Sequence, residues 1–143
     1  MFHKINHILP QIDRKLTVQF SEGVTKIYDI RKLYDKIPAF KILDESDELF
    51  NSVEVDTGGY GIVWDDDLDL SCDELWENGV VTETPFDNLI ALNEATIIWG
   101  LSESTLRKAI SYGKLVAGMD VCKFGKQWVV SRDAMIREYG NPK

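Results

Sequence analysis

Residues that bind metals or form disulfides are scarce in this sequence. The only histidines are His3 and His7, and the only cysteines, Cys72 and Cys122, lie far apart and form no C-x-x-C motif. A zinc site uses about four Cys or His ligands at short spacings, so we expect no zinc, other metal or cofactor. The cysteines are interpreted as reduced and partly buried, as in a cytoplasmic protein.

Long hydrophobic runs are missing as well. No apolar segment approaches the roughly 20 residues that span a bilayer, so no membrane partner is expected. The segment Met1–Pro10 lacks the continuous apolar core and the cleavage site of a signal peptide. With 44% hydrophobic and 28% charged residues, the composition is typical of a soluble globular protein. The length of 143 residues fits one ordinary domain or two small ones.

Positive charge is also scarce, and it is unevenly distributed. The chain has 16 Lys and Arg against 24 Asp and Glu, a formal net charge of −8. Residues 1–83 hold 8 basic against 18 acidic side chains, whereas residues 84–143 hold 8 against 6. Phosphate would repel the first segment but not the second. We therefore predict an acidic domain at 1–83 and a mildly basic domain at 84–143, with different partners.

The first domain is predicted to be small and β-rich. Leu16–Phe20 and Val24–Ile30 alternate as half-buried strands and flank the turn Ser21-Glu22-Gly23, so they predict a β-hairpin. The other predicted elements are short helices at Ile30–Lys36, capped by Asp29, and at Ser46–Phe50, strands at Val53–Asp56 and Tyr60–Trp64, and a helix from the Ser71–Glu74 capping box to Gly79.

An acidic cluster lies before that last helix, at Asp65, Asp66, Asp67, Asp69, Asp73 and Glu74. An EF-hand loop beginning at Asp65 needs glycine at its sixth position and glutamate at its twelfth, but these positions hold Leu70 and Trp76. We therefore interpret the cluster as a solvated turn followed by acidic residues at a helix N-terminus, where the helix dipole favours negative charge.

The second domain has the caps and spacing of a helix-turn-helix. The two predicted helices are Glu94–Trp99, with N-cap Asn93 and stop Gly100, and Glu103–Tyr112, with N-cap Ser102 and stop Gly113. Only about three residues separate them, which is the spacing of this motif. The predicted elements that follow are strands at Leu115–Ala117 and Lys123–Val130, the latter turning at Phe124-Gly125-Lys126-Gln127, and a helix Arg132–Tyr139 between Ser131 and Gly140.

The second helix of such a motif enters the major groove of DNA. A core stripe at Leu106, Ala109 and Ile110 turns its other side chains outward. Outward residues near its N-terminal end can reach base edges, and Arg107 can bind a guanine or a phosphate. Residues on or beside the wing can contact phosphates. The predicted DNA-binding residues are Ser104, Thr105, Arg107, Lys108, Tyr112, Lys114, Lys123, Lys126, Gln127 and Arg132.

Five short motifs follow one another in the second domain: Leu92-Asn93-Glu94-Ala95, Trp99-Gly100-Leu101-Ser102, Ser104-Thr105-Leu106-Arg107, Gly113-Lys114-Leu115 and Gly125-Lys126-Gln127-Trp128-Val129-Val130. In this order they resemble the excisionase and MerR-like winged helix-turn-helix proteins, over about Leu89–Gly140. Members bind DNA with the second helix and the wing, so the resemblance implies those roles for Thr105, Arg107, Lys108 and Lys126.

The first domain carries motifs of its own: Leu16–Gly23, Tyr28-Asp29-Ile30, Leu49-Phe50, Ile62-Val63-Trp64-Asp65, Asp69-Leu70-Ser71 and Glu74–Gly79. Over about His3–Val81 these resemble the small bacterial domain-of-unknown-function family numbered 2442. The resemblance implies a small α+β domain, of the kind sometimes joined to a helix-turn-helix and proposed as an antitoxin-like partner of another protein.

The sequence therefore predicts an α+β protein in which a β-rich α+β domain precedes a winged helix-turn-helix. We expect a non-enzymatic transcriptional regulator that binds double-stranded DNA as a homodimer, because one short reading helix rarely gives enough specificity. Its acidic domain would dock a protein partner, such as a toxin. A protein-interaction adaptor that does not bind DNA stays open as the alternative, because the net charge is negative. Catalysis by a Ser–His–Asp set is not expected, since both histidines lie within the first seven residues.

Overall fold

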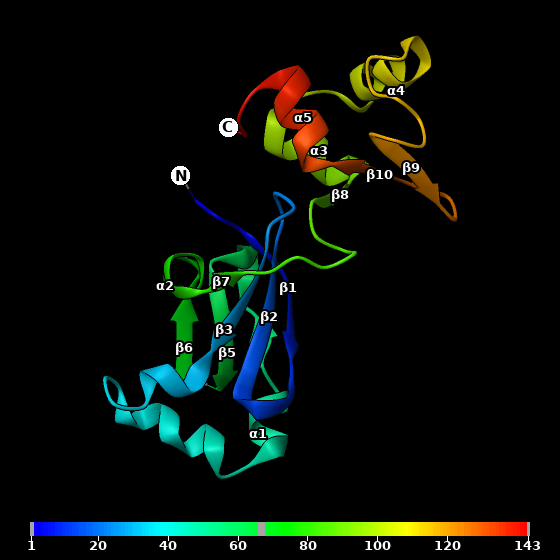
Figure 1. Cartoon of the computed structure of the whole chain (residues 1–143). Coiled ribbons are helices and arrows are strands. Elements are labelled where there is room, and N and C mark those ends of the chain that lie inside the picture. The colour runs from blue at the N-terminus through cyan, green and yellow to red at the C-terminus, as the bar shows by residue number, and fades with distance from the viewer. Residues whose placement is uncertain (1, 66–67, 143) are drawn as a thin grey trace. The chain divides into compact units, whose positions relative to one another are not determined.

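The chain has an α+β fold in the computed structural model, which describes residues 2–65 and 68–142 (Figure 1). It divides into two compact units. The N-terminal unit contains Phe2–Phe20 and Thr25–Glu83, and the C-terminal unit contains Ser21–Val24 and Thr84–Lys143. Each unit has buried apolar residues of its own. Within the described residues, no helix has the length and apolar character needed to cross a membrane.

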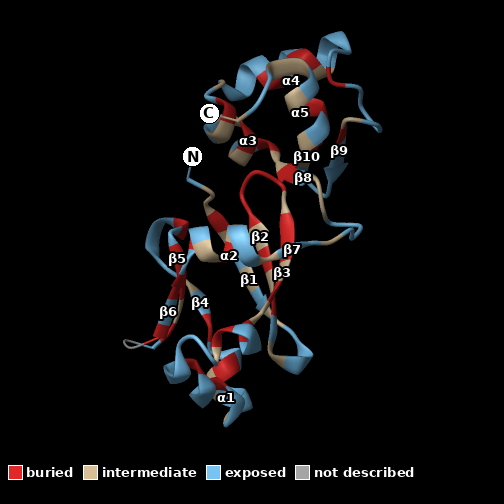
Figure 2. Cartoon of the chain, turned by 60° about the vertical axis from the view of Figure 1, so that its left-hand side comes forward, coloured by how far each residue is buried: buried red, intermediate tan, exposed pale blue. Residues whose placement is uncertain are grey.

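The N-terminal unit contains a four-stranded antiparallel sheet in the order β1-β2-β3-β7. The predicted β-hairpin is confirmed, with Lys15 opposite Asp29 and Gln19 opposite Thr25. Figure 2 shows buried residues along both of its strands. The strands of the sheet are β1 (Ile5–Pro10), β2 (Lys15–Phe20), β3 (Thr25–Asp29) and β7 (Val80–Val81).

The sequence does not predict two of these strands, β1 and β7. In β1 only Ile5 is buried, and Ile8 and Leu9 stand side by side, so the alternation that marks a half-buried strand is weak. Strand β7 is two residues long and both are exposed. Backbone pairing with β2 and β3, and not a hydrophobic pattern, places these edge strands.

Short helices connect the strands of this unit. The side chain of Asp29 accepts a hydrogen bond from the Arg31 amide at 3.1 Å, confirming the predicted cap, but the helix is a short 3-10 turn. The helix predicted at Ser46–Phe50 forms over Asp47–Asn51, and the Ser46 hydroxyl caps it by accepting from the Leu49 amide at 3.1 Å. The helices before the second sheet are η1 (Ile12–Arg14), η2 (Ile30–Leu33), η3 (Pro38–Asp44) and α1 (Asp47–Asn51).

Helix η3 is not predicted from the sequence. Pro38 is the first residue of η3, where its missing N–H costs nothing and its fixed φ suits a helical turn. The loop is therefore helical beyond the proline. It buries Phe40 and Leu43.

A second antiparallel sheet has the order β4-β5-β6, with strands β4 (Glu54–Val55), β5 (Gly61–Asp65) and β6 (Leu68–Ser71). Strand β4 lies within the predicted strand Val53–Asp56, and β5 overlaps the predicted strand Tyr60–Trp64 but extends to Asp65. They flank helix η4 (Thr57–Gly59), whereas β6 was not expected. The predicted polar turn before β6 includes Asp66 and Asp67, which lie outside the described residues. The side chain of Asp65 accepts from the Leu68 amide at 3.0 Å.

Helix α2 (Cys72–Asn78) begins at the predicted cap and ends at Gly79. The Ser71 hydroxyl accepts from the Glu74 amide at 3.2 Å. In a capping box the glutamate accepts from the backbone amide of the cap residue. Here the Glu74 carboxylate accepts from the Tyr28 hydroxyl at 2.8 Å, which joins α2 to strand β3. Burial and this carboxylate raise the pKa of Tyr28. Glu74 therefore has a tertiary partner as well as its place in the first turn of the helix.

The C-terminal unit has a three-stranded antiparallel sheet, β8-β10-β9, and three helices. Its elements are β8 (Leu89–Ala91), α3 (Leu92–Trp99), α4 (Glu103–Tyr112), β9 (Val121–Phe124), β10 (Gln127–Ser131) and α5 (Arg132–Tyr139). The predicted second helix, tight turn and last helix are confirmed. The Ser131 hydroxyl accepts from the Ala134 amide at 3.0 Å and caps α5.

Two predictions for this unit are wrong. Asn93 does not cap the first helix, because strand β8 passes directly into α3 and Ala91 occupies the cap position without a side-chain hydrogen bond. Leu115–Ala117 is not a strand. It forms a turn in which the Asp120 carboxylate accepts from the Val116 amide at 2.8 Å, and Leu115 is fully buried.

Asp120 also joins this turn to helix α5. Its two carboxylate oxygens accept from the Arg137 guanidinium at 3.1 and 2.8 Å, and its backbone carbonyl accepts from the Ser131 amide at 2.8 Å. The hydrogen bonds from Arg137 lower the pKa of Asp120. Cys122, expected to be partly buried, is exposed two residues later, whereas Cys72 is buried, and both thiols are free.

We expect Asp120→Asn to lower the free energy of unfolding by about 1–2 kcal/mol at neutral pH, because hydrogen bonds to a charged partner are weakened. The folded state lowers the pKa of Asp120. Its stabilisation is therefore present above the unfolded-state value of about 4 and is lost as the pH falls through the lower folded-state value. Urea unfolding of both proteins across the acid range measures this.

Asp35→Asn is the control, because Asp35 is exposed in a loop of the N-terminal unit. Its stability should follow the wild-type curve at every pH. If the difference in free energy of unfolding between wild type and Asp120→Asn stayed constant down to the lowest pH, the ionised Asp120 carboxylate would not be its source.

Candidate nucleic-acid interface

Helices α3 and α4 are joined by a turn that fixes their relative direction. Gly100 ends α3 in the left-handed conformation, with φ of 66°, which glycine adopts without steric cost. Ser102 then caps α4 by accepting from the Thr105 amide at 3.1 Å. Trp99, Leu106 and Ala109 are buried in one core. The caps and the shared core thus hold the two helices as one motif.

The opposite side of α4 is exposed, as the predicted core stripe requires. Leu106 and Ala109 are buried and Ile110 packs against them, so Ser104, Thr105 and Lys108 face solvent. The Ser102 hydroxyl lies 3.1 Å from that of Ser104 and 2.8 Å from that of Thr105, forming a row of hydroxyls over the first turn. Within the described residues, Lys108 has no ion-pair or hydrogen-bond partner. At the other end of α4, Tyr112 is 83% exposed.

Arg107 lies one turn after Glu103 on the same exposed side. Its Nε and Nη2 atoms donate to one oxygen, Glu103 Oε1, at 3.1 and 2.7 Å. Both side chains remain more than half exposed, at 59% and 53%. The guanidinium is therefore held in one orientation while it stays accessible to a ligand.

The predicted basic residues beside α4 lie on the hairpin β9–β10 or next to α5. Lys123 Nζ lies 5.6 Å from the ring centroid of Trp128, and Lys114 Nζ lies 4.5 Å from that of Tyr139. Lys126 is exposed at the turn of the hairpin. Among the described residues, no carboxylate pairs with Lys108, Lys114, Lys123 or Lys126.

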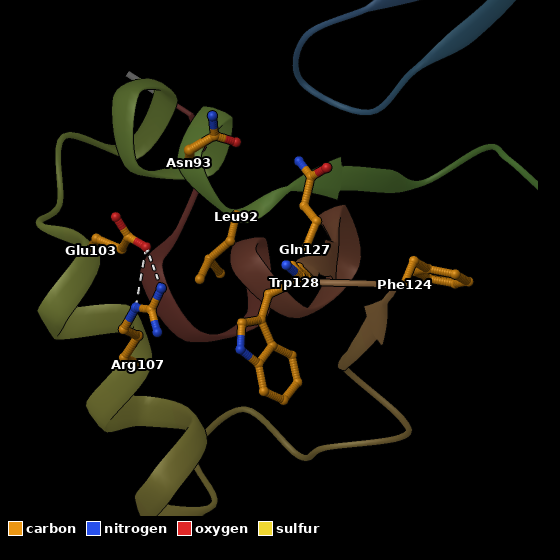
Figure 3. Close-up of a pocket in the computed structure, with 8 residues that line it drawn as sticks. Leu92, Asn93, Glu103, Arg107, Phe124, Gln127 and Trp128 are labelled. Carbon is orange, nitrogen blue, oxygen red and sulfur yellow. Dashed lines mark hydrogen bonds and ion pairs between the residues drawn. The ribbon is translucent and has the colours of Figure 1, made fainter.

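A groove of about 480 Å³ separates α4 from the hairpin (Figure 3). Arg107 and Glu103 lie on one side of it, and Gln127 and Trp128 lie across from them. Three predicted residues, Arg107, Lys126 and Gln127, are thus brought to one place. The groove is lined by Leu92, Asn93, Glu103, Arg107, Phe124, Lys126, Gln127 and Trp128.

Arg132 does not join this group. It is the first residue of α5, its side chain is only 26% exposed, and its guanidinium lies 3.7 Å from the Glu22 carboxylate within the C-terminal unit. Ser104, Thr105, Lys108, Tyr112, Lys114 and Lys123 also lie outside the groove lining. The groove is therefore one part of the exposed surface that α4 and the hairpin provide.

The sequence alone does not indicate the other residues that line the groove. Asn93 is predicted to be a cap, and Leu92 and Trp128 enter only as parts of motifs. The signal that could reveal them is the strand pairing: β8 and β10 are neighbours, so the start of α3 lies beside the hairpin that follows α4.

Comparison with known protein families gives two matches. The sequence model described as "Protein of unknown function (DUF2442)" matches residues 6–81, more than half of the chain. The chain belongs to the DUF2442 family. A second model, described as "Helix-turn-helix domain", matches residues 82–143, which includes α3, α4 and the groove. No curated protein and no solved structure matches the chain.

The two matches agree with both proposed resemblances at the level of domain type. The DUF2442 match covers the sheets of the N-terminal unit, and the second match supports a DNA-binding role for the C-terminal unit. The finer likeness to excisionase and MerR-like proteins, and the role of the hairpin as a wing, stay predictions.

Ser102→Ala should lower the stability of the C-terminal unit by about 1 kcal/mol, because the amides of the first turn of α4 lose their cap. The control is Ser111→Ala, in the same helix but without a capping role, which should be neutral or slightly stabilising. Thermal unfolding followed by circular dichroism compares the two. Equal transition temperatures in both variants would contradict the capping role.

Proposed function

We propose that this protein is a DNA-binding transcriptional regulator that acts by binding alone, without a catalytic step. Helix α4 would enter the major groove of double-stranded DNA and the hairpin β9–β10 would act as the wing on the neighbouring phosphates. One observation carries the proposal: Glu103 and Arg107, on the exposed side of α4, lie across an open groove from a hairpin that carries Lys126 and Gln127.

The distribution of charge supports a DNA-binding surface formed by α4 and the hairpin. In the C-terminal unit, Asp120 and Glu138 both pair with Arg137, and Glu103 pairs with Arg107. The lysines of α4 and the hairpin keep no carboxylate partner within the described residues. A segment whose formal net charge is only +2 (8 basic against 6 acidic side chains in residues 84–143) can thus present several cations to phosphates.

The DUF2442 domain would supply the regulatory input. Residues 1–83 carry 18 acidic against 8 basic side chains, so we propose that this domain docks a protein and not DNA. An antitoxin-like arrangement, in which the docked protein is a toxin, is one form of this proposal. We also propose a homodimer, because two copies of α4 reading two half-sites give more specificity than one.

A protein-interaction adaptor is the second candidate function, and the net charge of −8 favours it. In that case the helix-turn-helix would serve as a scaffold for protein contacts only. A pull-down with the full chain separates the two functions. Recovery of a stable protein partner without retained DNA, together with no duplex binding at low salt, would support the adaptor and contradict the regulator.

Removal of Lys108 or Lys126 tests the proposed DNA contacts. If each contacts one phosphate, Lys108→Ala and Lys126→Ala should each weaken duplex binding by about 5–10-fold near 0.1 M salt. Each should also reduce the slope of log affinity against log salt by about 1, with little change in sequence preference. Fluorescence anisotropy with a labelled duplex, titrated from about 50 to about 200 mM salt, measures both quantities.

Lys41→Ala is the matched control, since Lys41 is an exposed lysine of η3 in the N-terminal unit. It should leave affinity and slope unchanged. An equal loss of affinity in Lys41→Ala would indicate a nonspecific charge effect, and unchanged binding in the other two variants would contradict the proposed interface.

A further inference from the structure

The pair Glu103–Arg107 leaves one edge of the guanidinium open. A guanidinium has five N–H donors arranged as a rigid fork. Glu103 Oε1 accepts from Nε and Nη2, so it occupies the side edge of the fork. The end edge, formed by Nη1 and the outer N–H of Nη2, makes no hydrogen bond within the described part of the chain. Two parallel N–H donors, one on Nη1 and one on Nη2, are thus available to a ligand.

Two parallel donors match two neighbouring acceptors. In the major groove, guanine presents O6 and N7 side by side, and bidentate donation from arginine to these atoms is the commonest base-specific contact. Arg107 lies in the N-terminal half of α4, the part of such a helix that meets base edges. Both the chemistry and the position of the end edge therefore fit a guanine.

Helix stabilisation alone does not account for the position of Glu103. An exposed pair at this spacing contributes only about 0.3–0.5 kcal/mol to a helix. Glu103 lines the groove between α4 and the hairpin, where a carboxylate repels phosphate and weakens binding to any DNA. This loss of affinity is compensated if the carboxylate makes the protein distinguish better between DNA sequences.

We propose that Arg107 reads one guanine in the major groove and that Glu103 determines this specificity by holding the guanidinium away from phosphate. The inference rests on the proposed function, in which α4 enters the major groove. Arg107 touches the base, and Glu103 is a positioning residue that acts through Arg107. Glu103 therefore lowers the affinity for all sequences and raises the preference for guanine at one position.

The experiment begins with the full-length chain and a randomised duplex pool of about 20 base pairs, from which bound sequences are selected. Dissociation constants are then measured for the selected duplex, for each single base-pair change in it, and for a random-sequence duplex. The proteins compared are wild type, Arg107→Lys, Glu103→Gln and Arg31→Ala. Arg31 is the matched control, because it forms an exposed pair with Asp44 in the N-terminal unit, with an Nε–Oδ1 distance of 3.2 Å.

Arg107→Lys keeps the charge but loses the fork, so binding to the random duplex should stay within about 2-fold. Its preference for guanine at one position should fall about 10-fold or more. Glu103→Gln should bind the random duplex several-fold more tightly, because a negative charge is removed, while its preference for guanine at the same position also falls. Arg31→Ala should match wild type in both measurements.

The outcomes that overturn the inference are distinct from those that overturn the proposed function. If both variants keep the full guanine preference while the wild type binds duplex, the inference fails and the regulator stands. If Glu103→Gln loses affinity, preference and thermal stability together, Glu103 serves the helix only and the inference fails. If the wild type enriches no duplex from the pool, the proposed function fails and the inference fails with it.

Discussion

The left-handed turn at Gly100 is the constraint on which the candidate interface depends. It ends α3 one residue after Trp99, whose indole N–H donates to the Gly140 carbonyl at 2.8 Å and ties α3 to the end of α5. Ser102 can then start α4 at an angle that buries Leu106. A β-carbon at position 100 would strain this turn, and the exposed side of α4 would lose its fixed direction.

Strand pairing supplies the second part of the interface. Strand β10 lies between β8 and β9, so the segment entering α3 and the hairpin following α4 belong to one sheet. Asn88, with φ of 65°, strengthens this arrangement because its side chain accepts from the Asp133 amide at 3.0 Å. The groove is thus lined by three segments: the start of α3 and the hairpin, which adjoin or belong to one sheet, and α4, which packs on the same core.

The features of the fold that neighbouring residues determine are the ones that the sequence predicts. The caps at Ser71, Ser102 and Ser131 and the bounds of α4 follow from side chains within three residues of each helix start. Strand β1 pairs with the next strand, β2, but its own alternation is too weak to predict it. Strands β7 and β8 could not be predicted, because they are short and partners far along the chain place them. The cap assigned to Asn93 is wrong for the same reason: β8 extends the ordered backbone up to Ala91.

In the candidate site, too, local features are predicted and contacts between side chains are not. Periodicity identifies the exposed residues of α4, but it cannot show that Glu103 engages the side edge of Arg107 or that Arg132 lies against Glu22. These pairings change the electrostatic argument, because carboxylates already engage the guanidinium groups of Arg107 and Arg132, and lysines are left as the unpaired cations. A module whose phosphate contacts come from these lysines alone gains limited affinity from the DNA backbone. A larger share of its binding energy must then come from contacts that depend on base sequence, and a guanidinium held by a carboxylate is suited to such contacts.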